Sequence, residues 1–124
     1  MSRLARFAWA TLVVNVAVVV YGAYVRATGS GAGCGPSWPT CDGQIIPAEF
    51  DSARVVEFTH RVTSGIAAVM VAVVAIWVLR TFAKGHQIRT AAGLSGIFII
   101  SESLVGAVLV VAEWVADEAS PWSA

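Results

Sequence analysis

Three long, mostly apolar stretches limit the fold of this 124-residue chain more than any other feature of its sequence. Residues 7–25 contain no charged side chain, and Asn15 is their single strongly polar residue. A second uncharged run covers residues 62–79, and a third apolar run covers residues 90–115. A helix needs about 20 mostly apolar residues to cross the hydrocarbon core of a bilayer. The sequence therefore predicts an all-α integral membrane protein with three transmembrane helices, near residues 7–25, 55–79 and 90–115.

The first run is expected to remain as a helix rather than to be cleaved as a signal peptide. It is longer than a usual signal-peptide core, and Tyr21, Tyr24 and Arg26 make a poor cleavage context. Within this helix, Asn15 is expected to form a hydrogen bond with a neighbouring helix.

The composition agrees with a membrane protein and argues against a nucleic-acid partner. Charged residues make up 13% of the chain, whereas soluble domains average about 25%. Eight basic and eight acidic residues give a formal net charge of zero, and nucleic-acid binding requires a basic surface. The length leaves room for three spans and one sizeable loop, so residues 1–124 are expected to form a single membrane domain.

Residues 26–53 are expected to form a compact loop, because closely spaced glycines are followed by Pro36 and Pro39. Cys34 and Cys41 lie within this loop. A disulfide is the default reading of such a pair on the oxidising side of a membrane. A redox-active thiol pair stays open as an alternative; a zinc site is disfavoured because the loop has no histidine.

The distribution of basic residues predicts the orientation. The segment before the first run and the segment between the second and third runs should lie on the same side of the membrane. Most basic residues are found in these two segments: Arg3, Arg6, Arg80, Lys84 and Arg89. The positive-inside rule places that side in the cytoplasm, so the N-terminus is expected inside and the cysteine loop outside.

The pentapeptide EFTHR at residues 57–61 is the strongest candidate for a functional site. It opens the second apolar run, and ionisable groups at a membrane helix require an explanation because they are costly there. If the segment is helical, Glu57 and His60 are an i,i+3 pair, with Arg61 beside them. His60 is a candidate metal or haem ligand, and Glu57 a candidate working carboxylate. The alternative is an ordinary interfacial helix start whose polar groups cap the helix and meet lipid headgroups.

Two further ionisable residues bear on this site. His86 is the only other histidine, and it is expected at the opposite membrane face, so it cannot share a metal with His60. Glu102 lies near the middle of the third run, where a carboxylate is a functional hypothesis by default. A protonated Glu102 that bonds to Ser103, Asn15 or a backbone group is an equally open reading.

Several linked motifs resemble the N-terminal half of the haem A synthase family. They are GAYVRATGSGAGC at residues 22–34, WPTCDGQ at residues 38–44 and EFTHR at residues 57–61. SLVGA at residues 103–107 and the Ala116–Asp117 pair are similar to the family's third helix and its exit. The resemblance covers essentially the whole chain.

The resemblance implies a membrane enzyme built from two similar four-helix halves, each with a pair of haem-ligating histidines. The family oxidises a methyl group of haem O to the formyl group of haem A, for cytochrome oxidase assembly. The implied substrate and product are haem O and haem A, with haem b in the other half. The chain stops where the fourth helix, with the second histidine, would begin, so a C-terminal half or a partner chain is expected to supply that ligand. Haem O synthase is a further expected partner, and the bacterial plasma membrane the expected location.

Carried over to this chain, the resemblance makes His60 an axial ligand of haem iron and Glu57 the carboxylate near the reacting edge. It also implies a Cys34–Cys41 disulfide. From their charge, Arg26 or Arg61 is expected to face a haem propionate. A haem-binding or assembly-partner membrane protein without turnover remains the alternative function.

Overall fold

The computed structural model describes residues 1–112, and within them the chain forms three α-helices and no β-strand. The helices are α1 (Arg3–Ala27), α2 (Ser52–Thr81) and α3 (Gln87–Val111). Each is long and apolar enough to cross a membrane. The predicted all-α fold with three membrane-spanning helices is therefore confirmed.

The helices begin earlier than the apolar runs predict, because polar caps lie outside those runs. The Ser2 side chain accepts a hydrogen bond from the backbone N–H of Ala5 at 3.1 Å and caps α1. Asp51 caps α2 by accepting from the N–H of Arg54 at 2.8 Å. The final part of the predicted third helix, residues 113–115, and the tail at 116–124 lie outside the described residues.

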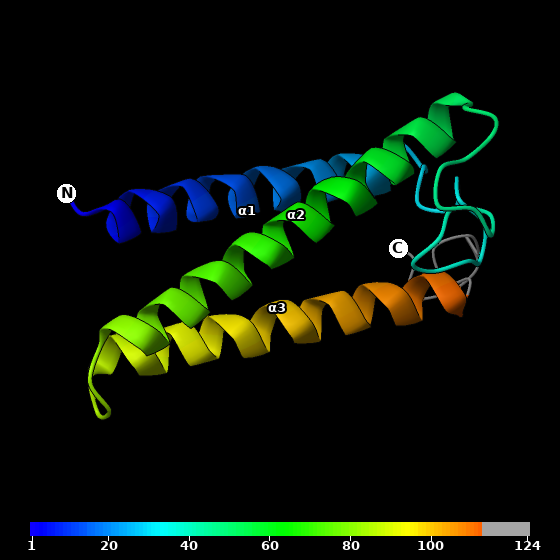
Figure 1. Cartoon of the computed structure of the whole chain (residues 1–124). Helices are drawn as coiled ribbons and strands as arrows, with labels where there is room; N and C mark the ends of the chain where they lie inside the picture. The colour runs from blue at the N-terminus through cyan, green and yellow to red at the C-terminus, as the bar shows by residue number, and fades with distance from the viewer. Residues whose placement is uncertain (113–124) are drawn as a thin grey trace.

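Helix α2 lies between the other two helices and contacts both (Figure 1). Aromatic contacts at the two ends of α1 show that α1 and α2 are antiparallel. The ring centroids of Phe7 and Trp77 lie 6.3 Å apart at one end, and those of Tyr21 and His60 lie 5.9 Å apart at the other. Helices α1 and α3 do not contact each other over the described residues.

The protein core is thin, as expected for helices that face lipid. Ala67, Val71 and Val78 are buried on one stripe of α2, whereas most large apolar side chains of α1 and α3 are exposed. Asn15 does not reach a neighbouring helix as predicted: its amide donates to the carbonyl of Thr11, one turn earlier in α1, at 2.8 Å. A carbonyl four residues earlier is always within reach of such a side chain.

Residues 28–51 form the loop between α1 and α2, and it lies at the end of the molecule opposite the N-terminus (Figure 1). The expected disulfide joins Cys34 and Cys41, and both residues are fully buried. The N–H of Asp42 donates to the carbonyl of Cys34, and the N–H of Cys41 donates to that of Gln44, each at 2.8 Å. The loop is therefore an ordered cap on the helices.

Candidate functional site

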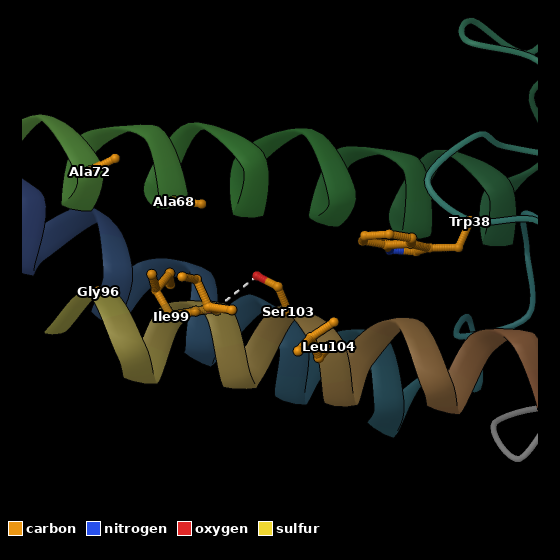
Figure 2. Close-up of a pocket in the computed structure, with 8 residues that line it drawn as sticks. Trp38, Ala68, Ala72, Gly96, Ile99, Ser103 and Leu104 are labelled. Atoms are coloured by element: carbon orange, nitrogen blue, oxygen red, sulfur yellow. Dashed lines mark hydrogen bonds between the residues drawn. The ribbon is translucent and has the colours of Figure 1, made fainter. Parts of the chain in front are cut away.

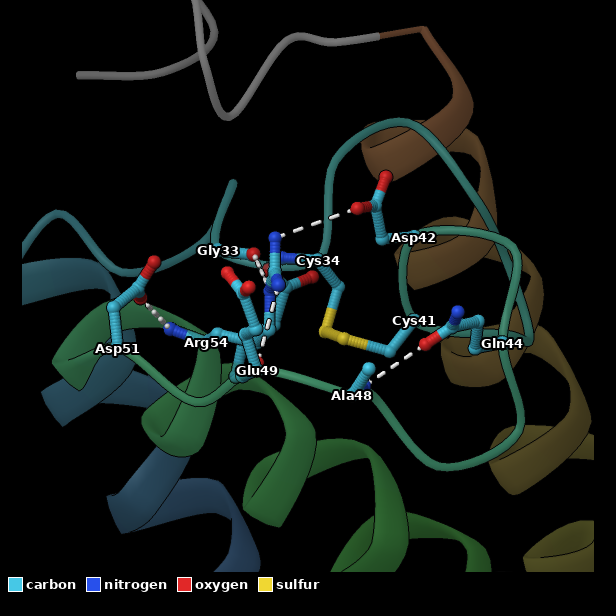
Figure 3. Close-up of polar contacts among 10 residues, drawn as sticks. Gly33, Cys34, Cys41, Asp42, Gln44, Ala48, Glu49, Asp51 and Arg54 are labelled. Carbon is cyan, nitrogen blue, oxygen red and sulfur yellow. Dashed lines mark hydrogen bonds and ion pairs between the residues drawn. A yellow bond between two sulfur atoms is a disulfide. The ribbon is translucent and has the colours of Figure 1, made fainter.

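Polar side chains on one stripe of α2 fasten the loop to the helix. Arg54, Glu57 and Arg61 follow an i, i+3, i+7 spacing, which places them on the same face. The Arg54 guanidinium donates to the carbonyls of Gly33 at 3.2 Å and Glu49 at 3.1 Å, and it pairs with the Asp42 carboxylate at 3.4 Å (Figure 3). The first turns of α2 thus hold both ends of the disulfide ring.

Gly33 allows the loop to approach α2 closely. A Cβ atom at this position would lie 2.3 Å from the backbone carbonyl oxygen of Ala53, far inside any normal contact. Glycine is therefore required where the loop crosses the start of α2.

Glu57 is buried beneath the loop, with 3% of its surface exposed. One carboxylate oxygen, Oε2, accepts the backbone N–H of Cys34 at 2.6 Å. The other, Oε1, accepts from Nε of Arg61 at 3.1 Å and also forms an ion pair with Nη2 of the same guanidinium. Both oxygens are therefore engaged by donors, and the Glu57 side chain joins the disulfide ring to α2.

Arg61 continues the attachment on the other side of the ring. Its Nη1 donates to the carbonyls of Ser37 and Thr40, each at 2.6 Å. These two carbonyls flank Trp38 and Pro39, so the guanidinium fixes the segment that carries the indole. With its two bonds to Glu57, Arg61 uses four of the five N–H donors that a guanidinium offers.

Trp38 closes one end of a cavity of about 260 Å³ between α2 and α3 (Figure 2). Small residues make the space: Ala68 and Ala72 line it on α2, and Gly96 on α3. Ser103 also lines the cavity, but its hydroxyl donates to the carbonyl of Ile99 in its own helix at 2.8 Å. The cavity is therefore apolar in character.

His60 lies beside this cluster, but its side chain contacts a different helix. Its ring faces α1, where it meets Gly22 and Tyr21. The Nδ1 atom is buried and has no hydrogen-bond partner. No hydrogen bond joins His60 to Glu57 over the described residues, so the predicted pair shares a helix end but points to different surroundings.

A buried imidazole nitrogen without a hydrogen-bond partner is costly, so the Nδ1 atom of His60 requires an explanation. A bound metal would provide one, because neutral imidazole nitrogen is a common metal ligand. Within residues 1–112, no three His, Cys, Asp or Glu side chains are grouped so that they could hold a metal ion. A single imidazole can ligate a metal that brings its other ligands with it, as iron does in a porphyrin.

The remaining predicted residues lie on other helices than His60. Glu102 is exposed on α3. Arg26 is exposed in the last turn of α1, at the loop end of the molecule. The structure thus brings Glu57, Arg61 and the cysteines into one cluster, with His60 adjacent to it.

Several residues of this region were not predicted. Arg54 had no assigned role, although its i+7 spacing to Arg61 could have indicated a shared face. The carbonyls of Ser37 and Thr40 give no sequence signal. Gly22 gives none either, because its contact with His60 depends on how α1 packs against α2.

By fold, the chain is a multi-pass α-helical membrane protein whose central helix carries a polar cluster at one end, under a disulfide-closed loop. The family model named COX15-CtaA, described as cytochrome oxidase assembly protein, matches residues 5–54 and 48–123. These matches cover most of the chain. The chain therefore belongs to this family.

Individual relatives carry two different names. A protein named "Protoheme IX farnesyltransferase" from Thermus thermophilus is 55% identical over 119 residues, which are 96% of this chain and 20% of that protein. Proteins named "Heme A synthase" from Geobacillus thermodenitrificans and Geobacillus kaustophilus are 42% and 39% identical over 105 residues, which are 85% of this chain and 33% of each relative. The chain thus spans a third or less of the length of these relatives. No solved structure matches the chain.

Proposed function

We propose that this chain is the substrate-haem portion of a haem A synthase of the bacterial plasma membrane. The observation that carries the proposal is the buried, unpartnered Nδ1 of His60, on a membrane-spanning helix of a chain that resembles proteins named "Heme A synthase". In this proposal His60 is an axial ligand of the substrate haem. A C-terminal half or a partner chain supplies the second histidine.

The polar cluster would hold the haem edge that reacts. Arg61 keeps one N–H donor beyond its four contacts, and Arg26 lies at the same end of the molecule, so either can meet a propionate. Glu57 would place a negative charge near the reacting methyl group, where preorganised charge stabilises developing positive charge. Because Glu57 also anchors the loop, a test of its proposed catalytic role must separate the effect of its charge on the reaction from its effect on the position of the loop.

The proposed reaction converts a haem methyl group to a formyl group. Overall, the methyl carbon takes one oxygen atom from water and loses four electrons and four protons. The electrons go to an acceptor outside this chain.

The farnesyltransferase name of one relative suggests a second candidate, a share in farnesyl transfer. That relative is about 600 residues long, because 119 residues are 20% of it, whereas the heme A synthases are about 320 residues long. Both kinds of relative contain a segment similar to this chain, and the farnesyltransferase has several hundred further residues that could carry out farnesyl transfer. This supports oxidation as the function of the segment, with a haem O synthase as its partner.

Haem titration of this chain in lipid nanodiscs tests the ligand assignment. His60→Ala should weaken haem binding and shift the haem absorption band, whereas His86→Ala, on an exposed residue at the start of α3, should do neither. Equal spectra for wild type and His60→Ala would refute the proposal.

Assays of the complete enzyme then separate the candidate functions. Conversion of haem O to haem A supports the oxidase, and production of haem O from haem b and farnesyl diphosphate supports the transferase. Haem binding without either activity supports an assembly role. Within the oxidase, Glu57→Gln keeps an acceptor for the Cys34 N–H, so loss of conversion with haem still bound would identify a role for the Glu57 charge.

A further inference from the structure

Gly22 of α1 lies directly against the His60 ring. A Cβ atom placed on Gly22 would lie 3.0 Å from Cε1 and 3.2 Å from Nε2 of His60, but 3.9 Å from Nδ1. The ring therefore rests with its Cε1–Nε2 edge on the bare backbone of α1. The adjacent Tyr21 ring lies 5.9 Å away, tilted by 52°, and borders the same space.

This contact distinguishes Gly22 from the other glycines within the described helices. A Cβ atom on Gly65, Gly93, Gly96 or Gly106 would meet nothing within 4 Å. Among the glycines of the described helices, Gly22 is the one whose missing side chain makes room for an ionisable group. An alanine there would require the His60 ring to move by a few tenths of an ångström, because no flexible group intervenes.

We propose that Gly22 is a positioning residue that sets the place of the His60 imidazole and thereby its bond to haem iron. This inference rests on the proposed function, in which His60 binds the iron. Ligand distances in metal sites vary by only about 0.2 Å, so the displacement that a methyl group at position 22 imposes is large on that scale. Through this contact, α1 controls a ligand that α2 carries.

The ligand-free chain tests the contact itself. Carbethoxylation of histidines in nanodiscs, followed by mass spectrometry, gives separate rates for His60 and His86. Gly22→Ala should raise the His60 rate, because the ring is pushed away from α1, and leave the His86 rate unchanged. Gly65→Ala is the matched control, since it adds the same methyl group to open space on the helix that carries His60. An unchanged His60 rate in Gly22→Ala would overturn the inference.

Haem titration tests the consequence for the ligand. Gly22→Ala should bind haem about tenfold more weakly and with a shifted absorption band, the scale on which residues supporting a metal ligand act. Gly65→Ala should bind like wild type. Alanine favours a helix over glycine, so both variants should fold.

A double variant shows whether the effect passes through His60. In a His60→Ala background, the further change Gly22→Ala should alter neither affinity nor spectrum, because the affected ligand is gone. An effect of equal size in both backgrounds would overturn the inference. If His60→Ala alone has no effect, the proposed function fails; if His60→Ala has an effect and Gly22→Ala has none, only the role of Gly22 fails.

Discussion

Removal of the Glu57 carboxylate should release the disulfide loop from α2. In Glu57→Ala, the Arg61 charge would remain in a site where 12% of its side chain is exposed, and the N–H of Cys34 would lose its acceptor. Removing one partner of a buried ion pair costs about 3–5 kcal/mol. Arg61 keeps its bonds to the carbonyls of Ser37 and Thr40, so the lower end of this range, about 3 kcal/mol, is expected.

Hydrogen exchange at the Cys34 amide measures this loss directly. A cost of about 3 kcal/mol corresponds to roughly 100-fold faster exchange, because about 1.4 kcal/mol is a factor of ten. Amides in the middle of α2 should keep their protection, since the change is confined to the loop. Glu49→Gln is the control: it removes a charge from an exposed residue of the same loop and leaves the Glu49 carbonyl that binds Arg54. Equal exchange in Glu57→Ala and Glu49→Gln would refute the anchoring role.

Three further outcomes are expected. Gly33→Ala should separate the loop from the start of α2 and lower the midpoint of thermal unfolding, because its methyl group would overlap the Ala53 carbonyl; an unchanged midpoint would contradict this. Replacing both Cys34 and Cys41 by serine should destabilise the docked loop by about 2.5 kcal/mol, because a disulfide that closes so short a ring removes about this much conformational entropy from the unfolded chain. Faster proteolysis of the loop would measure the loss. For orientation, a membrane-impermeant thiol reagent applied to whole cells should label Ile45→Cys in the loop but not Ala83→Cys in the α2–α3 connection; the reverse pattern would invert the predicted topology.

The helices could be predicted from the sequence because mostly apolar runs of sufficient length leave few alternatives. The sequence offers both Asp51 and Ser52 as caps before the second run, and the structure uses Asp51. The helix ends were less accurate: α2 begins at Ser52 rather than near residue 55, because polar residues extend a helix once a cap is formed. The Cys34–Cys41 bond followed from a sequence with only two cysteines on one loop.

The detailed contacts of the site could not be predicted in the same way. The spacing places Glu57 and His60 on one side of α2, but it does not show that the first binds the loop while the second faces α1. That division depends on the path of the loop and on the register between α1 and α2. The role of Asn15 was predicted wrongly because its own helix offers a nearer acceptor.

The absence of contact between α1 and α3 in the described chain has a thermodynamic consequence. Within the described residues, the outer helices are linked through α2 and through the loop, whose Trp38 borders the cavity between α2 and α3. The α1–α2 and α2–α3 interfaces should therefore contribute nearly independently to the free energy of unfolding. Changes at the Phe7–Trp77 contact and at Ala92, the buried residue of α3, should therefore add, whereas changes within one interface should couple.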